Sequence, residues 1–238
     1  SEQRTAFIEL AEASGLQHLT HAERSALHTT TFGVGELFLA ALDAGATHAL
    51  LLLGGSATND AGAGMLQALG ATLLDAQGQP LPPGGGALQQ LATLDLSTLD
   101  PRLAELRVEA AVDVDNPLLG ERGASAVFGP QKGATDADVA TLDRALGHFA
   151  DLTAKALGRD DRELPGAGAA GGMGFAAHCF LNATLTPGIE MIMQQANFAQ
   201  LLNDADLVIT GEGRLDGQSL AGKTPIGVSR AAKRQGKP

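Results

Sequence analysis

The chain has 238 residues, 44% of them hydrophobic, which is enough for one large or two modest domains with a real core. Its formal net charge is −11, and such a charge repels nucleic acid and anionic membranes, so we expect neither as a partner. Trp and Tyr are absent, which argues against base stacking.

The single cysteine, Cys179, excludes an internal disulfide and favours a reducing compartment, so we expect a cytoplasmic protein. It stands in an apolar helical run, where a packed thiol is expected rather than a nucleophile. No apolar run approaches the ~18 residues of a membrane span, and no signal peptide is visible. The chain opens at Ser1 rather than Met, so we expect a piece of a longer protein.

In chain order, apolar runs and periodicity predict strands that alternate with helices. Strands are expected at residues 5–10, 50–53, 72–74, 106–112 and 206–210. Helices are expected at residues 33–43, 63–69, 172–181, 189–202 and 225–233, and one more is expected to start after an N-cap at Thr135. Alternation of this kind predicts an α/β fold.

Residues 49–64 are the most informative stretch. Five apolar residues end in Gly54 and Gly55, small and polar residues follow, and a helix is expected to begin near Asp60. Loops between the carboxyl end of a strand and the amino end of a helix are where α/β proteins bind small molecules, and the exposed N–H groups there favour anions. The sequence therefore predicts one wall of a ligand pocket here.

Polar side chains follow three of the predicted strands. They are Asn59 and Asp60, then Asp113, Asp115 and Asn116, then Glu212, Arg214 and Asp216. Any one of these carboxylates could be a helix cap, but carboxylates at three strand ends beside a cation suggest chemistry. Lys132 adds a second cation in a loop before a helix, with a solvated surface lysine as the alternative.

Two glycine patterns invite a nucleotide-binding interpretation. Residues 166–171 match G-x-G-x-x-G, but the residues before them are charged and end in Pro165, where the fingerprint requires a strand. Residues 217–224 match G-x-x-x-x-G-K-[ST], the phosphate loop, and a helix follows. Six residues separate Gly217 from the preceding predicted strand, so we favour a looser phosphate contact by Lys223 over a true phosphate loop.

Several segments, in the order of a known family, closely resemble the bacterial type-1 glycerate kinases. They are Gly54-Gly55-Ser56-Ala57-Thr58-Asn59-Asp60, Asp113-Val114-Asp115-Asn116-Pro117-Leu118, Phe128-Gly129-Pro130-Gln131-Lys132-Gly133-Ala134, and residues 165–172 and 208–216. The resemblance covers nearly the whole chain. It implies phosphorylation of D-glycerate, usually at the 2-hydroxyl, with ATP and Mg²⁺.

The resemblance also implies two α/β lobes, one inserted into a Rossmann-like lobe, with the active site between them. Residues 1–187 would be the inserted lobe and residues 188–238 part of the other. Family members have further segments at both ends, including an opening strand and an Asp-Ser-x-Lys type loop. Whether this chain is active without them is an open question at this stage.

On this resemblance, roles can be assigned residue by residue. Asp60 or Asp113 would orient or deprotonate the substrate hydroxyl, and Lys223 would stabilise the transferring phosphoryl group. Lys132 and Arg214 would hold the carboxylate. The other expected substrate-binding residues are Ser56, Asn59, Asn116, Glu212 and Asp216, while the metal ligands are unknown.

Two alternative functions stay open at this point. A phosphate-loop NTPase would use Lys223 and hydrolyse ATP without glycerate. A non-catalytic ligand-binding α/β domain would bind small molecules without turnover. Neither the phosphorylated hydroxyl nor the oligomeric state follows from the sequence, although a homo-oligomer is compatible with it.

Overall fold

The computed structural model describes residues 4–211 and 224–238, and the chain divides into two compact units, residues 1–185 and 186–238. The first unit contains a sheet of order β1-β2-β5-β6. Its strands are β1 (Thr5–Glu9), β2 (His48–Leu52), β5 (Arg107–Ala111) and β6 (Thr184–Thr186). β1, β2 and β5 pair in parallel, so the carboxyl ends of these three strands lie at one edge.

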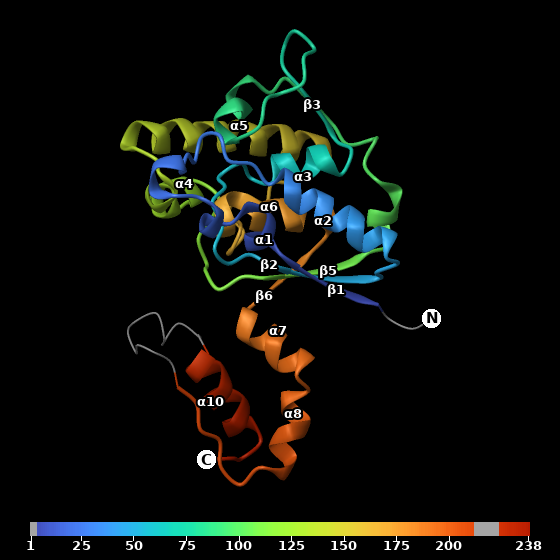
Figure 1. Ribbon diagram of the computed structural model, residues 1–238, viewed down its shortest axis with the longest axis vertical. Helices are drawn as coiled ribbons and strands as arrows, with labels where there is room; N and C mark the ends of the chain where they lie inside the picture. Colours follow the sequence, from blue (N-terminus) through green and yellow to red (C-terminus); the bar gives the residue numbers. More distant parts are fainter. Residues whose placement is uncertain (1–3, 212–223) are drawn as a thin grey trace. The chain divides into compact units, whose positions relative to one another are not determined.

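Helices cover one face of this sheet in layers (Figure 1). The inner layer contains α1 (Leu10–Ser14), α2 (Phe32–Asp43), α3 (Ala63–Ala68) and α6 (Ala169–Leu181). The long helix α5 (Asp136–Leu157) lies outside them, packed on α4 (Ala124–Phe128) and on the short helix Gly85–Gln90. β3 (Thr72–Leu74) and β4 (Thr93–Asp95) form a separate antiparallel pair. The remaining single-turn helices are Leu16–His18, His21–Glu23, Pro101–Ala104 and Pro130–Lys132.

The core explains why these residues form these elements. Leu51 is fully buried, and its partners on the neighbouring strands, Ile8 and Ala110, are buried as well. Because side chains along a strand alternate between the two faces of a sheet, these paired residues share one face. Phe149 on α5 and Phe175 on α6 pack edge to face, with ring centroids 6.4 Å apart. The α/β class expected from the alternation of elements is therefore present.

Most predicted elements are found within a residue or two of their expected bounds. Thr135 caps α5 as expected: its hydroxyl oxygen accepts from the Asp138 N–H at 3.2 Å, and the Asp138 carboxylate accepts from the Thr135 N–H at 2.9 Å. This reciprocal pair is a capping box, which satisfies two of the unpaired donors of the helix start. The same helix ends at Gly158, whose left-handed backbone is the usual helix stop.

Two predictions in the second unit were wrong. The expected helix at residues 189–202 is two helices, α7 (Gly188–Gln195) and α8 (Phe198–Leu201), because Asn197 adopts a left-handed φ of 50° between them. Asn tolerates that conformation, and helical periodicity does not reveal it. A single turn, Leu202–Asp204, follows α8.

The strand expected at residues 206–210 is absent from the described part of the chain. A strand needs a neighbouring strand, and here Val208 donates instead to the carbonyl of Pro238 at 2.9 Å. Ile209 stays 87% exposed. The last helix, α10 (Thr224–Arg234), forms as predicted.

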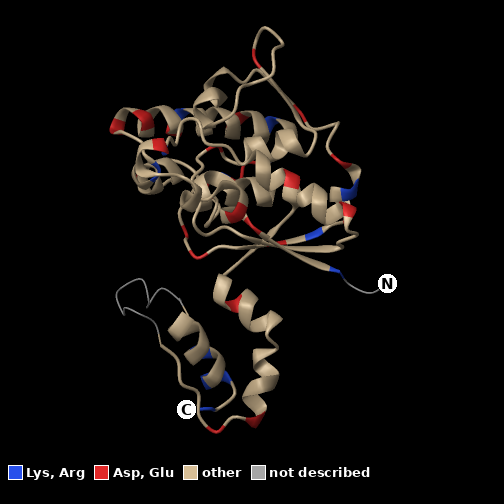
Figure 2. Cartoon of the chain, viewed as in Figure 1, with Lys and Arg blue, Asp and Glu red and all other residues tan. Residues whose placement is uncertain are grey.

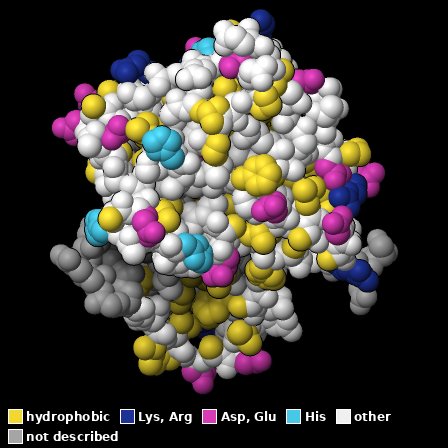
Figure 3. Space-filling view, turned by 45° about the horizontal axis from the view of Figure 1, so that its top comes forward, with side chains coloured by type: hydrophobic (Ala, Val, Ile, Leu, Met, Phe, Trp, Pro, Cys, Tyr) yellow, Lys and Arg dark blue, Asp and Glu magenta, His cyan; other side chains and the backbone are white. Residues whose placement is uncertain are grey.

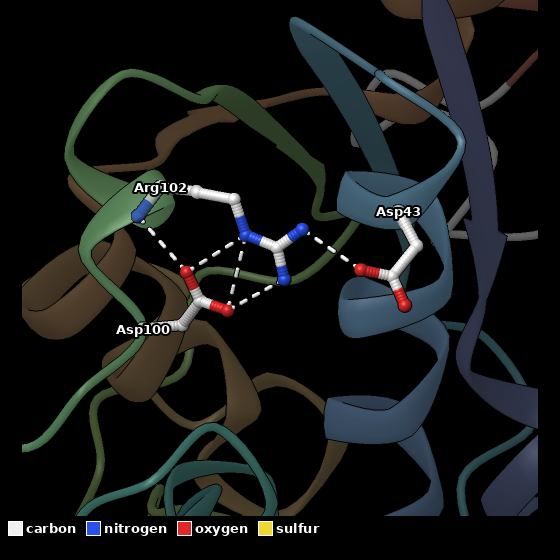
Figure 4. Close-up of polar contacts among 3 residues, drawn as sticks. All are labelled: Asp43, Asp100 and Arg102. Atoms are coloured by element: carbon white, nitrogen blue, oxygen red, sulfur yellow. Dashed lines mark hydrogen bonds and ion pairs between the residues drawn. The ribbon is translucent and has the colours of Figure 1, made fainter.

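Charged side chains are spread over the surface, and acidic ones outnumber basic ones (Figure 2). Acidic side chains are spread over many loops and helix ends, and basic ones are fewer (Figure 2). On the face shown in Figure 3, most Lys and Arg atoms lie near the rim rather than in one patch. Arg102 bridges Asp100 and Asp43 at 2.7 and 2.8 Å and ties its own turn to the end of α2 (Figure 4). Arg102 and Asp43 are exposed to solvent and Asp100 is partly buried, so these surface ion pairs contribute little to stability.

No helix in the described ranges has the length and apolar character needed to cross a bilayer.

Candidate functional site

A cavity of about 240 Å³ opens at the carboxyl ends of β2 and β5. The loops that follow these strands form two of its walls, and the turn Pro130–Lys132 and the start of α6 form the others. The lining is residues 53–56, 111–114 and 131–132 with Leu16, Phe128, Ala169 and Ala170. Parallel α/β sheets place ligand sites at this edge, and the sequence predicted a pocket wall at residues 54–64.

Lys132 is the most unusual residue of the cavity wall. Its side chain is 1% exposed, and its Nζ donates to Ser56 Oγ at 2.8 Å and to the Thr58 carbonyl at 2.6 Å. Burial lowers the pKa of Lys132 to about 7, although the negative charge of nearby Asp60 opposes that shift. The alternative of a solvated surface lysine is therefore wrong. Lys132 and Ser56, which were both expected to bind substrate, are in contact, and their substrate-binding role stays a prediction.

Asp60 is sealed into the protein rather than presented to the cavity. Its carboxylate accepts from the Thr31 N–H at 2.8 Å and the Thr31 hydroxyl at 2.9 Å, and from the N–H groups of Gly62 and Gly64 at 3.2 Å. Burial raises the pKa of Asp60, and these hydrogen bonds oppose the rise. Because Gly62 and Gly64 lie at the start of α3, this geometry favours a bracing role over the predicted catalytic one, which stays a prediction.

Asn59 is likewise fully buried and does not line the cavity. Its amide nitrogen donates to Ser125 Oγ at 2.9 Å, which ties the loop after β2 to α4. Its Oδ1 is buried and has no hydrogen-bond partner within the described residues. The structure thus shows Asn59 as a link between walls, and its predicted substrate contact stays a prediction.

The polar residues of the loop after β5 lie in two settings, one at the cavity and the others in contacts within the loop. Asp113 is exposed and lines the cavity. Asp115 pairs with Arg122 at 3.1 Å, and the side-chain amide of Asn116 donates to the Arg122 carbonyl at 2.7 Å. Asn116 therefore stabilises the loop, while Asp113 is the carboxylate that a ligand in the cavity would meet.

The glycines of residues 166–172 make close backbone packing possible. No strand leads directly into this run, which follows α5 and a loop at residues 158–165, so its fit to the dinucleotide fingerprint has no structural support. Gly171 has a φ of 69°, and a Cβ there would collide with the Thr58 carbonyl oxygen. Its own carbonyl accepts from the Ala61 N–H at 2.9 Å. The run holds the loop after β2 against α6, and Ala169 and Ala170 thereby reach the cavity.

Sequence reasoning missed Thr31, Phe128 and Gln131. Thr31 is buried, and its hydroxyl both donates to Asp60 and accepts from the Met65 N–H at 3.0 Å. The motif around Lys132 contains Phe128 and Gln131, so proximity to the predicted cation was a usable signal for both. Nothing local marks Thr31, because its partner is 29 residues away.

Four predicted site residues lie outside the described residues: Glu212, Arg214, Asp216 and Lys223. The phosphate-loop pattern at residues 217–224 lies almost wholly there too. Their predicted roles stay predictions.

Neither the described side chains nor the size of the cavity favours a metal or nucleotide site in this part of the chain. Between residues 4–211 and 224–238, no group of three or more His, Cys, Asp or Glu side chains could hold a metal ion. A volume of about 240 Å³ falls below the roughly 300–1,000 Å³ of pockets for drug-sized ligands. The cavity therefore suits a small acid better than a whole nucleotide.

Comparison with known proteins gives a consistent result. The family model described as "Glycerate kinase family" matches residues 1–238. A glycerate kinase of Bacillus subtilis is 56% identical over 97% of the chain and 60% of its own length. The glycerate 2-kinase of Escherichia coli is 53% identical over 99% of the chain and 62% of its own length.

A solved structure is similar as well: a Salmonella typhimurium LT2 protein provisionally named glycerate kinase 2. It has a TM-score of 0.91 and 54% identity over 99% of this chain and 63% of that one. The chain thus spans about three-fifths of the length of these relatives. A match over its entire length, with identities above one half, shows that the chain belongs to the glycerate kinase family.

Proposed function

We propose that the protein transfers the γ-phosphoryl group of ATP to D-glycerate, at the 2-hydroxyl, and forms 2-phosphoglycerate. Membership of the family supports the reaction, and the name of the Escherichia coli relative supports the position. The observation that carries the proposal is the small cavity with the buried amine of Lys132 in its wall. Because the chain spans about three-fifths of its relatives, the proposal concerns the protein at their full length.

The cavity supports a division of roles. Lys132 and Ser56 present donors suited to the carboxylate, and Asp113 on the opposite loop is an acceptor suited to the substrate hydroxyl. Asp60 and Asn59 hold the loop that carries Ser56. Phosphoryl transfer depends mostly on positioning and charge, so rigid walls are as useful as reactive groups.

The proposed reaction also needs ATP, Mg²⁺ and four residues that lie outside the described ranges. Bound ATP would supply the phosphoryl group, and Mg²⁺ would neutralise its developing charge. Lys223 is proposed to stabilise the transferring phosphoryl group, and Arg214 to hold the carboxylate. Glu212 and Asp216 are proposed to bind the substrate.

The proposed organisation is an inserted lobe at residues 1–187 and part of a Rossmann-like lobe at residues 188–238. The compact units at residues 1–185 and 186–238 support it. A cytoplasmic location, expected from the single cysteine, is part of the same proposal.

The test is ADP release by a protein that carries this chain at the full length of its relatives, with Mg-ATP, with and without D-glycerate. Release that requires glycerate, with 2-phosphoglycerate as the product in ³¹P NMR, supports the proposal. Release that does not require glycerate would favour a phosphate-loop NTPase. Glycerate binding without any ADP release would favour a binding domain, and 3-phosphoglycerate as the product would overturn the choice of hydroxyl.

A further inference from the structure

The amine of Lys132 is buried, and the negative charge of nearby Asp60 does not offset the effect of that burial. Both of its hydrogen-bond partners, the Ser56 hydroxyl and the Thr58 carbonyl, are neutral groups. Within the part of the chain that the structure describes, Lys132 forms no ion pair. A buried ammonium group without an anion is costly, so the empty cavity favours the neutral amine.

The protonated form of Lys132 has one donor left for a ligand. An ammonium group has three N–H donors, and two of them serve Ser56 and Thr58. Because the Ser56 oxygen accepts from Lys132, its own hydroxyl proton is available to another acceptor. Both residues line the cavity, so a ligand beside them meets two donors and must bring acceptor oxygens.

We propose that this cavity takes up an anion and a proton together: a carboxylate binds at Lys132 and Ser56, and Lys132 becomes protonated as it binds. The anion supplies a direct ionic partner for the amine, and the charged amine then gains a strong hydrogen bond. The inference rests on the proposed function for the identity of the ligand, D-glycerate, and adds a pH dependence to its binding.

The charges around Lys132 agree with this coupling. The pKa of Lys132 is lowered to about 7, so roughly nine-tenths of the amines are neutral at pH 8 and about one-tenth at pH 6. Asp60 lies close enough to raise that pKa, and Asp113 lines the same cavity. Arg24 donates to the carbonyl of Gln131 at 3.2 Å and adds a positive charge on the other side.

Titration calorimetry with the 238-residue chain and D-glycerate tests the proposal. Binding is measured at pH 6 and pH 8, each in two buffers of different ionisation enthalpy, which reveals the number of protons exchanged. We expect uptake of close to one proton at pH 8 and little at pH 6. The dissociation constant should rise up to tenfold per pH unit above pH 7. Glycerol, which lacks the carboxylate, should cause no proton uptake.

Variants separate the two donors. Ser56→Ala should keep the proton uptake at pH 8 but weaken binding about ten- to hundredfold, through loss of a hydrogen bond to a charged group. Lys132→Met should lose both the uptake and most of the binding. Lys155→Met removes an exposed lysine of α5 and should behave as the wild type. Circular dichroism establishes whether each variant is folded, and an NMR titration of Lys132 with and without glycerate gives the answer on the wild type alone.

Two results would overturn the proposal: glycerate binding with equal proton exchange at pH 6 and pH 8, or no glycerate binding by the folded chain at pH 6. Both are independent of turnover. A kinase that binds glycerate without proton uptake refutes the coupling alone. If glycerate binding by the chain is coupled to proton uptake but the full-length protein transfers no phosphoryl group, only the proposed function is refuted.

Discussion

Replacing Lys132 by Met should change how stability depends on pH. The pKa of this lysine falls from 10.5 to about 7 in the folded protein. One pKa unit corresponds to about 1.4 kcal/mol, so charging the buried amine costs the fold about 5 kcal/mol. Between pH 7 and 10.5 the unfolded chain holds more protons than the folded one, and stability therefore rises with pH. Below pH 7 the full penalty is present.

The size of the effect can be worked out for a practical range. From pH 7 to pH 9, the Lys132 contribution to the free energy of unfolding should rise by about 2 kcal/mol. Lys132→Met should remove this rise. The variant also loses the hydrogen bonds to Ser56 and Thr58, but that loss is nearly the same at both pH values, so it cancels from the comparison. The pH dependence thus isolates the titration.

The assay is urea unfolding at pH 7 and pH 9, followed by far-UV circular dichroism, because the chain has no Trp or Tyr to report by fluorescence. Lys155→Met, which removes an exposed lysine, should keep the wild-type pH dependence. An equal rise in wild type and Lys132→Met would show that Lys132 stays protonated in the folded chain. In that case the argument from its unpaired burial would be wrong.

Three other substitutions test the cavity wall at Asp113 and the packing behind it at Thr31 and Gly171. Asp113→Asn should lower kcat of the full-length protein by about 10²–10⁴-fold and change stability by less than about 0.5 kcal/mol, and unchanged turnover would remove Asp113 from the chemistry. Thr31→Val, measured by urea unfolding, should cost about 1–3 kcal/mol, because it leaves the buried Asp60 carboxylate short of a donor. Gly171→Ala should destabilise the chain by more than the ~1 kcal/mol of a typical substitution, because a Cβ there meets the Thr58 carbonyl; a neutral effect would contradict the packing argument.

The sequence was sufficient where the signal is local. The apolar run that becomes β2 and the N-cap at Thr135 depend on neighbours within a few residues. The strand was therefore predicted to within two residues, and the start of α5 was predicted where it is found. Asn197 shows the limit of periodicity, since one left-handed residue divides a regular apolar pattern into two helices.

Burial of polar side chains could not be predicted in the same way. Lys132 stands in a short turn that looks solvent-exposed, and its partner Ser56 is 76 residues away along the chain. Asp60 follows a glycine turn at the end of a strand, a position where catalytic carboxylates are common. Its hydrogen bonds from Thr31 become visible only in the folded chain. Both facts depend on tertiary pairing, which one sequence does not display.

The contrast between Asp60 and Asp113 suggests how such a loop serves a reaction. The first turn of α3 leaves N–H groups without helical partners, and a buried carboxylate satisfies them. Together with the two bonds from Thr31, these bonds give the Asp60 carboxylate four donors and brace the loop, while its catalytic role stays a prediction. The polar groups that line the cavity itself include Asp113, Ser56 and Lys132. The residues that brace the loop after β2 are thus different from the polar residues that line the cavity.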